Sequence, residues 1–231
     1  MKKTKFVILT GAGISAESGL ATFRAQNGLW EGYNVDDVAT YEGYLRDPVQ
    51  VHRFYNMLRK KLQQPNVKPN TAHFALAKLE YTIGSENVTI VTQNVDNLHE
   101  QAGSKNIIHM HGELLKVRDE QTGQIFDCYD DIYYEKNKMI RPHIVWFGEI
   151  PLYIDEIHQQ ITQADYFIAI GTSGHVYPAA NFVQLANQFG AHTIELNLEP
   201  SLKENLFDLK IYGPASQIVP HFIQQLLTKI A

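Results

Sequence analysis

The chain has 231 residues, a formal net charge of −5 at pH 7 and a pI of about 6.0. It is long enough for a large hydrophobic core, but its acidic balance argues against a sequence-independent grip on nucleic acid. No apolar run approaches the roughly 20 residues that span a bilayer. The single cysteine, Cys128, excludes an internal disulfide and no signal sequence precedes the first strand-like run, so we expect a cytoplasmic protein that binds no nucleic acid and no membrane.

Apolar runs alternate with helix-like segments along most of the chain. The runs are rich in Ile and Val and apolar throughout, which is typical of strands covered on both faces. Their alternation with helices predicts an α/β fold with a doubly wound parallel sheet. In chain order, the expected strands are 6–11, 88–93, 107–112, 166–173 and 192–198, and the expected helices are 72–79, 155–164, 179–189 and 217–230.

Two stretches interrupt this alternation, at about 27–65 and 117–141. The first holds a loop and then a helix, because Asp47 suits the helix cap and Pro48 suits the first helical position. The second is polar. We expect both to be insertions that together build a small second lobe of a single unit, 1–231. The large lobe then takes about 1–26, 66–116 and 142–231.

Glycines follow the first expected strand in the motif GAGISA, Gly11 to Ala16. The motif fits a loose dinucleotide fingerprint, in which glycines let the backbone approach a pyrophosphate near a helix N-terminus. A glycine turn that packs strand against helix explains it equally well. In the usual fingerprint an acidic residue at the end of a second strand, about 20 residues later, holds the ribose. No strand is expected at that distance here. The ribose of a bound dinucleotide must therefore be held elsewhere.

Four other expected strands end in polar side chains, at 93–96, 111–113, 171–173 and 197–199. Turn formation explains any one of these ends, but ligands gather at the carboxyl ends of parallel strands, so all of them together predict a nucleotide site. His111 lies at one end, where a neutral imidazole suits a general base. Side chains two residues apart on a strand point to the same face, so His111 is expected on the same face as His109. Neither histidine has a spacing typical of metal ligands.

The chain carries six motifs that together cover nearly its whole length, in the order GAGISAESGLATFR, TQNVDNLH, HMHGELLKV, RPHIVWFGE, IAIGTSGHVYPAA and ELNLEPS. These motifs resemble the sirtuin family, in particular its bacterial CobB-type NAD-dependent protein-lysine deacylases. The resemblance implies a Rossmann-type large lobe and a small lobe built from insertions. It also implies NAD as cofactor and transfer of the acyl group of acyl-lysine proteins or peptides to ADP-ribose, with release of nicotinamide.

The resemblance also implies roles for single residues. His111 is the base that activates the ribose 2′-hydroxyl, and Asn94 is the second catalytic residue. Gln93, Asn94 and Asp96 bind the nicotinamide end of NAD. The other implied cofactor residues are Gly11, Ala12, Gly13, Ser15, Phe23, Arg24, Trp30, Gly171, Thr172, Ser173, Asn197, Leu198, Glu199 and Ala215; the implied substrate residues are Tyr55, Leu58, Val145, Phe147, Gly148, Glu149, Gly174, His175 and Val176.

The chain departs from most sirtuins in the segment 117–141. The family usually binds a structural zinc through four cysteines, whereas this segment supplies one cysteine and no histidine. A closed zinc site needs four ligands, so we expect no metal. The small lobe must then be held by its own packing, for which the available apolar residues are Ile125, Phe126, Ile132, Tyr133 and Met139.

A second departure concerns the acyl group. Members that accept succinyl-lysine hold its carboxylate with a tyrosine and an arginine three residues later, on one helix face. Here Tyr55 is followed by Leu58, and the neighbouring Arg59 is turned by about another 100°, although its flexible stem could reach round. An unpaired carboxylate costs about 1–3 kcal/mol. We therefore expect acetyl-, propionyl- and butyryl-lysine to be preferred over succinyl-lysine.

The same motifs would also fit three alternative functions. The glycine pattern alone suggests a hydride-transferring NAD(H) oxidoreductase, which would release no nicotinamide. A protein ADP-ribosyltransferase would cleave the cofactor in the same way. A non-enzymatic NAD-sensing module would lack the base, whereas His111 is present.

Overall fold

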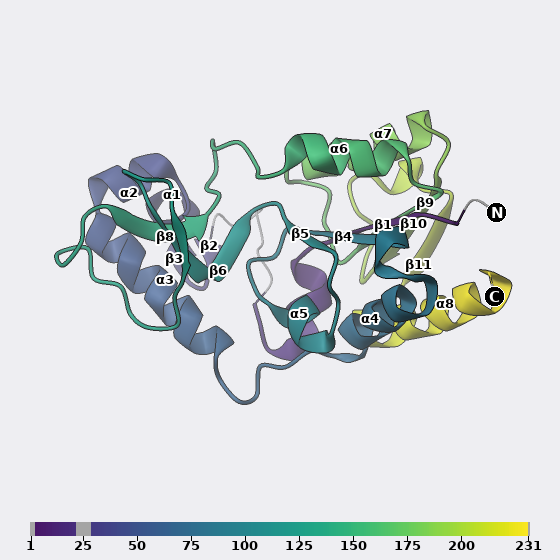
Figure 1. Cartoon of the computed structure of the whole chain (residues 1–231), viewed down its shortest axis with the longest axis horizontal. Coiled ribbons are helices and arrows are strands. Elements are labelled where there is room, and N and C mark those ends of the chain that lie inside the picture. Colours follow the sequence, from purple (N-terminus) through teal and green to yellow (C-terminus); the bar gives the residue numbers. More distant parts are fainter. Residues whose placement is uncertain (1–2, 22–28, 231) are drawn as a thin grey trace.

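The computed structural model describes residues 3–21 and 29–230 and has a large and a small lobe side by side (Figure 1). The first and last described residues both lie on the large lobe, away from the small one (Figure 1). Among the helices of the described residues, none combines the length and the apolar character needed to cross a membrane.

The large lobe is built on a six-stranded sheet in the order β11-β10-β9-β1-β4-β5, with all neighbours parallel. The chain adds β4 and β5 on one side of β1 and then returns to add β9, β10 and β11 on the other. The strand order therefore reverses between β1 and β9, and ligands of open α/β sheets bind at such a reversal. The strands are β1 (Phe6–Thr10), β4 (Val88–Thr92), β5 (Ile107–His109), β9 (Tyr166–Ile170), β10 (His192–Asn197) and β11 (Leu209–Tyr212).

All five strands expected from the apolar runs belong to this sheet, and the prediction of a doubly wound α/β fold is confirmed. The sequence pattern missed β11, because this edge strand is short and mostly exposed. It also made β5 too long: the strand ends at His109, and residues 110 and 111 form a turn.

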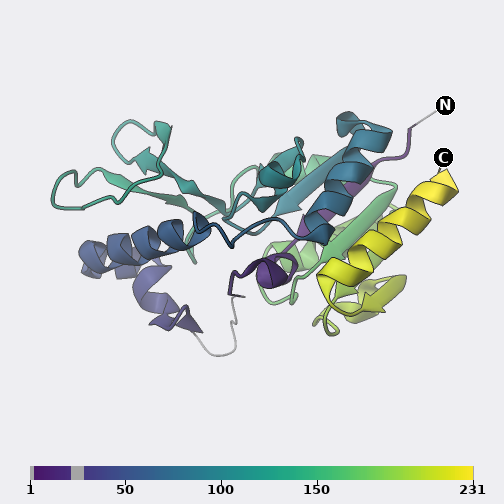
Figure 2. The same ribbon diagram turned by 90° about the horizontal axis from the view of Figure 1, so that it is seen from below.

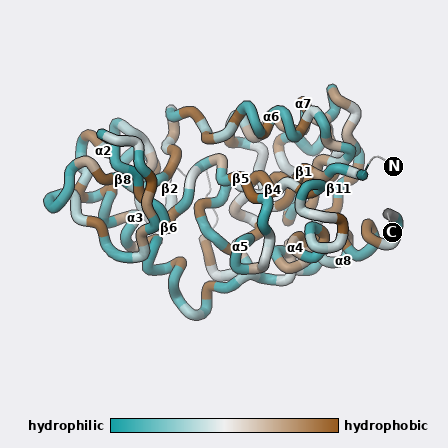
Figure 3. The backbone as a smooth tube through the Cα atoms, in the orientation of Figure 1, coloured by the Kyte–Doolittle hydropathy of each residue, from teal (hydrophilic) through white to brown (hydrophobic). Residues whose placement is uncertain are grey.

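Helices cover both faces of the sheet (Figures 1 and 2). Successive residues of β1 point to opposite faces, so Ile8 packs in the cluster with α4 and α8, whereas Leu9 packs in the cluster with α6 and α7. Hydrophobic residues accordingly run along β1 and β4 (Figure 3). The expected helices are present as α4 (Thr71–Ile83), α6 (Ile154–Thr162), α7 (Phe182–Gln188, after the 3₁₀ turn Ala179–Asn181) and α8 (Ala215–Ile230); short helices form at Ser85–Asn87, α5 (Leu98–Ala102) and Glu204–Leu206.

The small lobe combines three helices with a three-stranded antiparallel sheet in the order β7-β6-β8. Its longest helix begins as expected, since Asp47 accepts a hydrogen bond from the Gln50 amide at 2.9 Å and Pro48 takes the first position. The elements are β2 (Leu29–Trp30), β3 (Tyr33–Asn34), α1 (Val35–Val38), α2 (Tyr41–Arg46), α3 (Pro48–Leu62), β6 (Gly112–Asp119), β7 (Ile125–Asp127) and β8 (Ile140–Ile144). The lobe boundaries expected near residues 116 and 142 fall inside β6 and β8, and the division at those positions stays a prediction.

The apolar residues that were expected to pack the small lobe do not form its core, so this prediction was wrong. Ile125 and Phe126 of β7 are 48% and 45% exposed, Tyr133 and Met139 are exposed as well, and Ile132 is only partly buried. The reason is that β7 is an edge strand with all three of its residues exposed. The core of the lobe comes instead from Val51, Phe54, Tyr55 and Leu58 of α3 with Leu114, Ile144 and Trp146.

Hydrogen bonds from α3 hold the chain after β7, and we call this set the α3 clamp: Asn56, Arg59 and Gln63 with residues 129–132. The Asn56 amide donates to the Ile132 carbonyl (2.8 Å) and accepts from its N–H (2.9 Å). Arg59 donates to the carbonyls of Asp130 (3.2 Å) and, on β6, of Leu114 (3.1 Å). Gln63 donates to the Tyr129 carbonyl at 2.8 Å. Polar side chains thus position this segment.

Candidate active site

A cavity of about 750 Å³ lies at the carboxyl ends of β1, β4 and β9, where the strand order reverses. Its wall also includes Tyr55 and Leu58 of α3 and residues 144–149, which run from the last residue of β8 into the following segment. Large-lobe and small-lobe residues therefore face the same space. A volume of this size is typical of sites for cofactors and other small molecules.

Three glycines bring two backbone segments into close contact at this reversal. A Cβ on Gly11 would lie 2.7 Å from the Gly171 carbonyl oxygen, and a Cβ on Gly13 would lie 2.7 Å from Gly171 Cα. The Gly13 amide donates to the Gly171 carbonyl at 2.9 Å, and Gly171 has φ +62°, which favours glycine. Both explanations of the motif apply, because the glycines pack strand ends together and leave bare backbone beside the cavity. A seven-residue 3₁₀ helix, Ala12–Ser18, follows.

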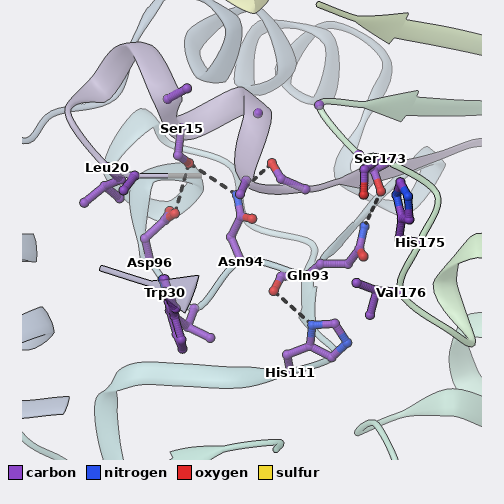
Figure 4. A pocket seen from close by; sticks show the side chains of 18 of the residues that line it. Ser15, Leu20, Trp30, Gln93, Asn94, Asp96, His111, Ser173, His175 and Val176 are labelled. Atoms are coloured by element: carbon purple, nitrogen blue, oxygen red, sulfur yellow. Dashed lines mark hydrogen bonds between the residues drawn. The ribbon is translucent and has the colours of Figure 1, made fainter. Parts of the chain in front are cut away.

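Ser15, Asn94 and Asp96 form one buried hydrogen-bond network (Figure 4). The Ser15 hydroxyl donates to Asp96 Oδ2 at 2.9 Å and accepts from Asn94 Nδ2 at 3.2 Å. Asn94 Nδ2 also donates to the Gly11 carbonyl at 3.1 Å. The network links the end of β4 to the turn after β1. It holds the Asn94 and Asp96 side chains in fixed orientations, as ligand recognition requires.

The Asp96 carboxyl is electrostatically unusual. Burial raises its pKa, because removal from water disfavours the charged form, and this effect exceeds the stabilisation from the Leu98 amide and the Ser15 hydroxyl. The Leu98 amide donates to Asp96 Oδ1 at 3.1 Å, at the start of α5. A perturbed carboxyl that lines a cavity is a candidate functional group.

Gln93 joins the end of β4 to the end of β9. Its side-chain amide donates to the Thr172 hydroxyl at 3.0 Å, and its backbone amide donates to the Thr10 carbonyl at 2.9 Å. Asn197, at the end of β10, donates to the Thr172 carbonyl at 2.8 Å. The polar strand ends are therefore bonded to one another, as well as lining one cavity.

His111 lies in the turn between β5 and β6, and its Nδ1 is 3.0 Å from the Gln93 carbonyl oxygen (Figure 4). A carbonyl only accepts, so Nδ1 carries the proton and Nε2 is the basic nitrogen. Burial lowers the pKa of His111, more than the Gln93 carbonyl raises it, so the ring is neutral near pH 7. The side chain lines the cavity. This arrangement would suit a general base.

His109 is not a partner of His111 on one strand face, as the period-two pattern predicted, because the strand ends between them. Its Nε2 lies 2.6 Å from Glu100 Oε1, and although burial opposes the charged form, this carboxylate raises the pKa of His109. Glu100, His109 and Glu113 present ligand atoms within 4.8 Å of one another, but Lys116 pairs with Glu113 at 2.7 Å. Both carboxylates therefore already have partners within the protein.

The small-lobe wall of the cavity is apolar. Tyr55 and Leu58 are buried in it, and the Trp146 indole N–H donates to the Tyr55 hydroxyl at 2.9 Å. Arg59 is held in the α3 clamp and does not line the cavity, so its stem does not reach round to the acyl group's side of the helix. Its guanidinium is bound by the backbone carbonyls of Leu114 and Asp130.

Glu149 lines the cavity, but its carboxylate is bound within the protein. Arg141 donates to both of its oxygens, at 2.8 and 3.0 Å, and the Trp146 amide donates at 2.8 Å. The Arg141 guanidinium lies 3.3 Å from the centre of the Trp146 ring, a cation–π contact. Glu149 therefore positions the 145–148 segment rather than offering a free charge.

Comparison with known proteins assigns the chain to a family, since residues 11–178 match the model described as "Sir2 family". The chain belongs to the Sir2 family. It is 59% identical to the "NAD-dependent protein deacylase" of Yersinia pseudotuberculosis serotype I (strain IP32953), over 99% of this chain and 84% of that protein.

Solved structures of the Sir2 family share the fold. A Sir2 homolog–NAD complex superposes with a TM-score of 0.88 at 33% identity, covering 100% of this chain and 92% of that one. A Sir2 in complex with the inhibitor EX-527, 2′-O-acetyl-ADP-ribose and deacetylated p53 peptide gives a TM-score of 0.80 at 28% identity, covering 98% and 95%. The Rossmann-type fold with a small lobe is therefore shown.

Nearly all residues implied by the Sir2 resemblance lie around the one cavity. The exceptions are Gly174, which is buried outside its lining, and Phe23 and Arg24, which lie outside the described residues. Sequence reasoning missed several lining residues, because they carry no polar motif or come from the small lobe. The lining residues it missed are Ala16, Leu20, Ala21, Glu31, Ala39, Lys61, Leu62, Val95, Leu114, Ile144, Trp146, Pro151, Tyr177, Leu196, Pro200 and Leu202.

Proposed function

We propose that this Sir2 family chain is an NAD-dependent protein-lysine deacylase, which transfers the acyl group of acyl-lysine to ADP-ribose with release of nicotinamide. The observation that carries the proposal is the geometry of His111. Its Nδ1 proton is engaged by the Gln93 carbonyl at 3.0 Å, and its ring lines the cavity at the strand reversal. Nε2 is thereby left to accept a proton from a bound hydroxyl group.

The residues around the cavity suit NAD. The backbone at Gly11, Gly13 and Gly171 is bare and would approach the pyrophosphate, while the Asn94–Ser15–Asp96 network would bind the nicotinamide end. The adenosine end would lie near Thr172, Ser173, Asn197, Leu198, Glu199 and Ala215. When bound, NAD supplies a ribose carbon that becomes electrophilic as nicotinamide departs.

The protein contributes positioning, exclusion of water and a base. Val145, Phe147 and Leu58 provide walls along which an acyl-lysine chain would lie, so its amide oxygen would meet the ribose without competing water. His111 Nε2 would take the proton of a ribose hydroxyl. Because burial keeps the pKa of His111 below its ordinary value of 6.5, the base is unprotonated at neutral pH. Activity should fall as the pH drops through that pKa.

The proposed partners are proteins or peptides that carry acyl-lysine. A substrate backbone would lie as an added strand between Gly148–Glu149 and the 174–176 segment, a form of β-augmentation. His175, Val176 and the half-exposed Phe147 line the cavity there, in agreement with such a path. The proposal includes no nucleic acid or membrane partner and places the enzyme in the cytoplasm, as the acidic charge and single cysteine favour.

The test is a product analysis with NAD and an acetyl-lysine peptide. Mass spectrometry should find deacetylated peptide, nicotinamide and acetyl-ADP-ribose in equal amounts. His111→Ala should lower kcat/KM by at least about 100-fold, because it removes the base, while NAD binding measured by calorimetry is kept. His221→Ala, on the exposed face of α8, is the matched control and should behave as wild type.

Other products would favour a different function. Reduced cofactor without nicotinamide would indicate a hydride-transferring oxidoreductase, and ADP-ribosylated peptide that keeps its acetyl group would indicate ADP-ribosyl transfer. Wild-type turnover in His111→Ala would remove His111 from the chemistry.

A further inference from the structure

Besides Glu149, which is paired with Arg141, a second ion pair lines the cavity, beside the apolar residues of α3. Lys61 Nζ is 2.5 Å from Glu31 Oε1, and both residues line the cavity. Their side chains are 35% and 20% exposed, so the pair is half-buried. The sequence motifs assign no role to either residue.

Lys61 lies beyond the residues expected to contact the acyl group. Tyr55, Leu58 and Leu62 line the cavity from the same helix, and Lys61 is one turn past Leu58, about 4.5 Å further along the axis. Among the described lining residues, Lys61 is the only lysine or arginine. It is therefore the cation that a carboxylate at the end of an acyl chain would meet.

Glu31 reaches Lys61 from the hairpin formed by β2 and β3. The preceding residue, Trp30, packs edge-on against Tyr55 with ring centres 6.2 Å apart, which places the hairpin over α3. Glu31 and Gly32 have φ of +50° and +83°, the signs of a type I′ turn. Asn or Gly is the usual first residue of such a turn, so glutamate is held in an unfavourable backbone conformation here.

We propose that the Lys61–Glu31 pair sets the acyl specificity of the cavity: Lys61 is the anchor for an acyl chain that ends in a carboxylate, and Glu31 holds that anchor neutralised. The inference rests on the proposed deacylase function. Uncharged acyl groups meet an apolar wall and a balanced ion pair. A succinyl carboxylate must displace Glu31 from Lys61 and lie beside a like charge, which disfavours it.

The test compares kcat/KM for matched acetyl-lysine and succinyl-lysine peptides. Glu31→Gln keeps the shape of the side chain and frees the Lys61 ammonium. The succinyl-to-acetyl ratio should then rise by on the order of fivefold, the effect of one partly solvated charge pair. Lys61→Met should lower the ratio below that of wild type, because it removes the anchor and keeps the apolar stem.

The double variant Glu31→Gln/Lys61→Met decides whether the two residues act through each other. The gain from Glu31→Gln should disappear in it, since no cation remains to be freed. Lys60→Met is the matched control, because Lys60 pairs with Asp131 outside the cavity, at 2.6 Å, and its ratio should equal that of wild type.

Two results would overturn the inference without touching the proposed function: an unchanged ratio in Glu31→Gln, or a gain that persists in the double variant. A wild-type protein that removes neither acyl group in the presence of NAD would instead reject the proposed function.

Discussion

The sheet of the large lobe and the chain after β7 in the small lobe are held in place by different kinds of interaction. The central strands of the large lobe are apolar on both faces, and β1, β4 and most of β9 are fully buried between helices. In the small lobe β7 is exposed along its whole length, and the chain after it is positioned by the α3 clamp. Non-directional burial therefore holds the central sheet and the small lobe's own core, whereas directional hydrogen bonds from α3 hold the segment after β7.

The difference matters because the cavity takes its walls from both lobes. The strand ends that bind one another belong to the rigid sheet, whereas Tyr55, Leu58 and Lys61 depend on how α3 is held. Asn56 and Arg59, on the same helix, bind the chain after β7. We therefore expect substitutions in the sheet to unfold the whole protein, and substitutions in the clamp to affect the small lobe and substrate use.

The largest effect is expected for Ile168→Ala in β9. Ile168 is completely buried in the cluster with α4 and α8, so truncation leaves a cavity and should lower the free energy of unfolding by about 2–5 kcal/mol. Urea denaturation measures this. Ile125→Ala in exposed β7 is the control and should change stability by less than about 0.5 kcal/mol. Equal losses from the two substitutions would contradict the contrast between the lobes.

A smaller effect is expected for Asn56→Ala. It removes both hydrogen bonds to Ile132 and one that Arg59 donates, at 2.9 Å, and leaves buried partners unmet, at a cost of about 1–3 kcal/mol. Hydrogen exchange of the variant should show that the amides of residues 129–132 lose protection while those of the central sheet keep it. Asn137→Ala, which removes one exposed bond to the Met139 amide, should have little effect. Uniform loss of protection across both lobes would argue against a separate clamp.

A pH-dependent effect is expected for Glu149→Gln. Burial alone would raise the pKa of Glu149, but bonds from Arg141 and the Trp146 amide lower it below its ordinary 4.5. The carboxylate therefore contributes stability above about pH 4.5, and the contribution disappears as the pH falls through the lowered pKa. At pH 7 the wild type should have a higher unfolding temperature than the variant, and this difference should shrink as the pH is lowered. A gap independent of pH would mean that the charge is not involved.

Removal of metal ions is expected to have no effect on stability. The segment 117–141 carries one cysteine and no histidine, too few ligands for a closed zinc site, and the α3 clamp bonds directly to residues 129–132. Treatment with a chelator should leave the unfolding temperature unchanged, and elemental analysis should find well under one zinc per chain. One tightly bound zinc, lost together with the small lobe's fold, would refute this prediction.

Local pattern was sufficient for most of the large lobe and for the strand-end side of the cavity. Strands such as Phe6–Thr10 and Val88–Thr92 are buried throughout and mostly apolar because helices cover both faces, so a few adjacent residues are enough to predict them. Parallel strands place their carboxyl ends at one edge, so Gly11, Gln93 and Gly171 had to meet wherever such a sheet formed. The same logic brought His111 to this edge, although it lies in a turn rather than in the expected strand.

Tertiary structure alone decided the small-lobe side. Arg59 and Lys61 are both long cations on α3, yet one binds the Leu114 and Asp130 carbonyls and the other pairs with Glu31 at the cavity. These partners are 55, 71 and 30 positions away in the chain, so no local pattern specifies them. Where a long, flexible side chain has several orientations open to it, the nearest unmet carbonyl or carboxylate selects one, and only the packed fold brings that group within reach.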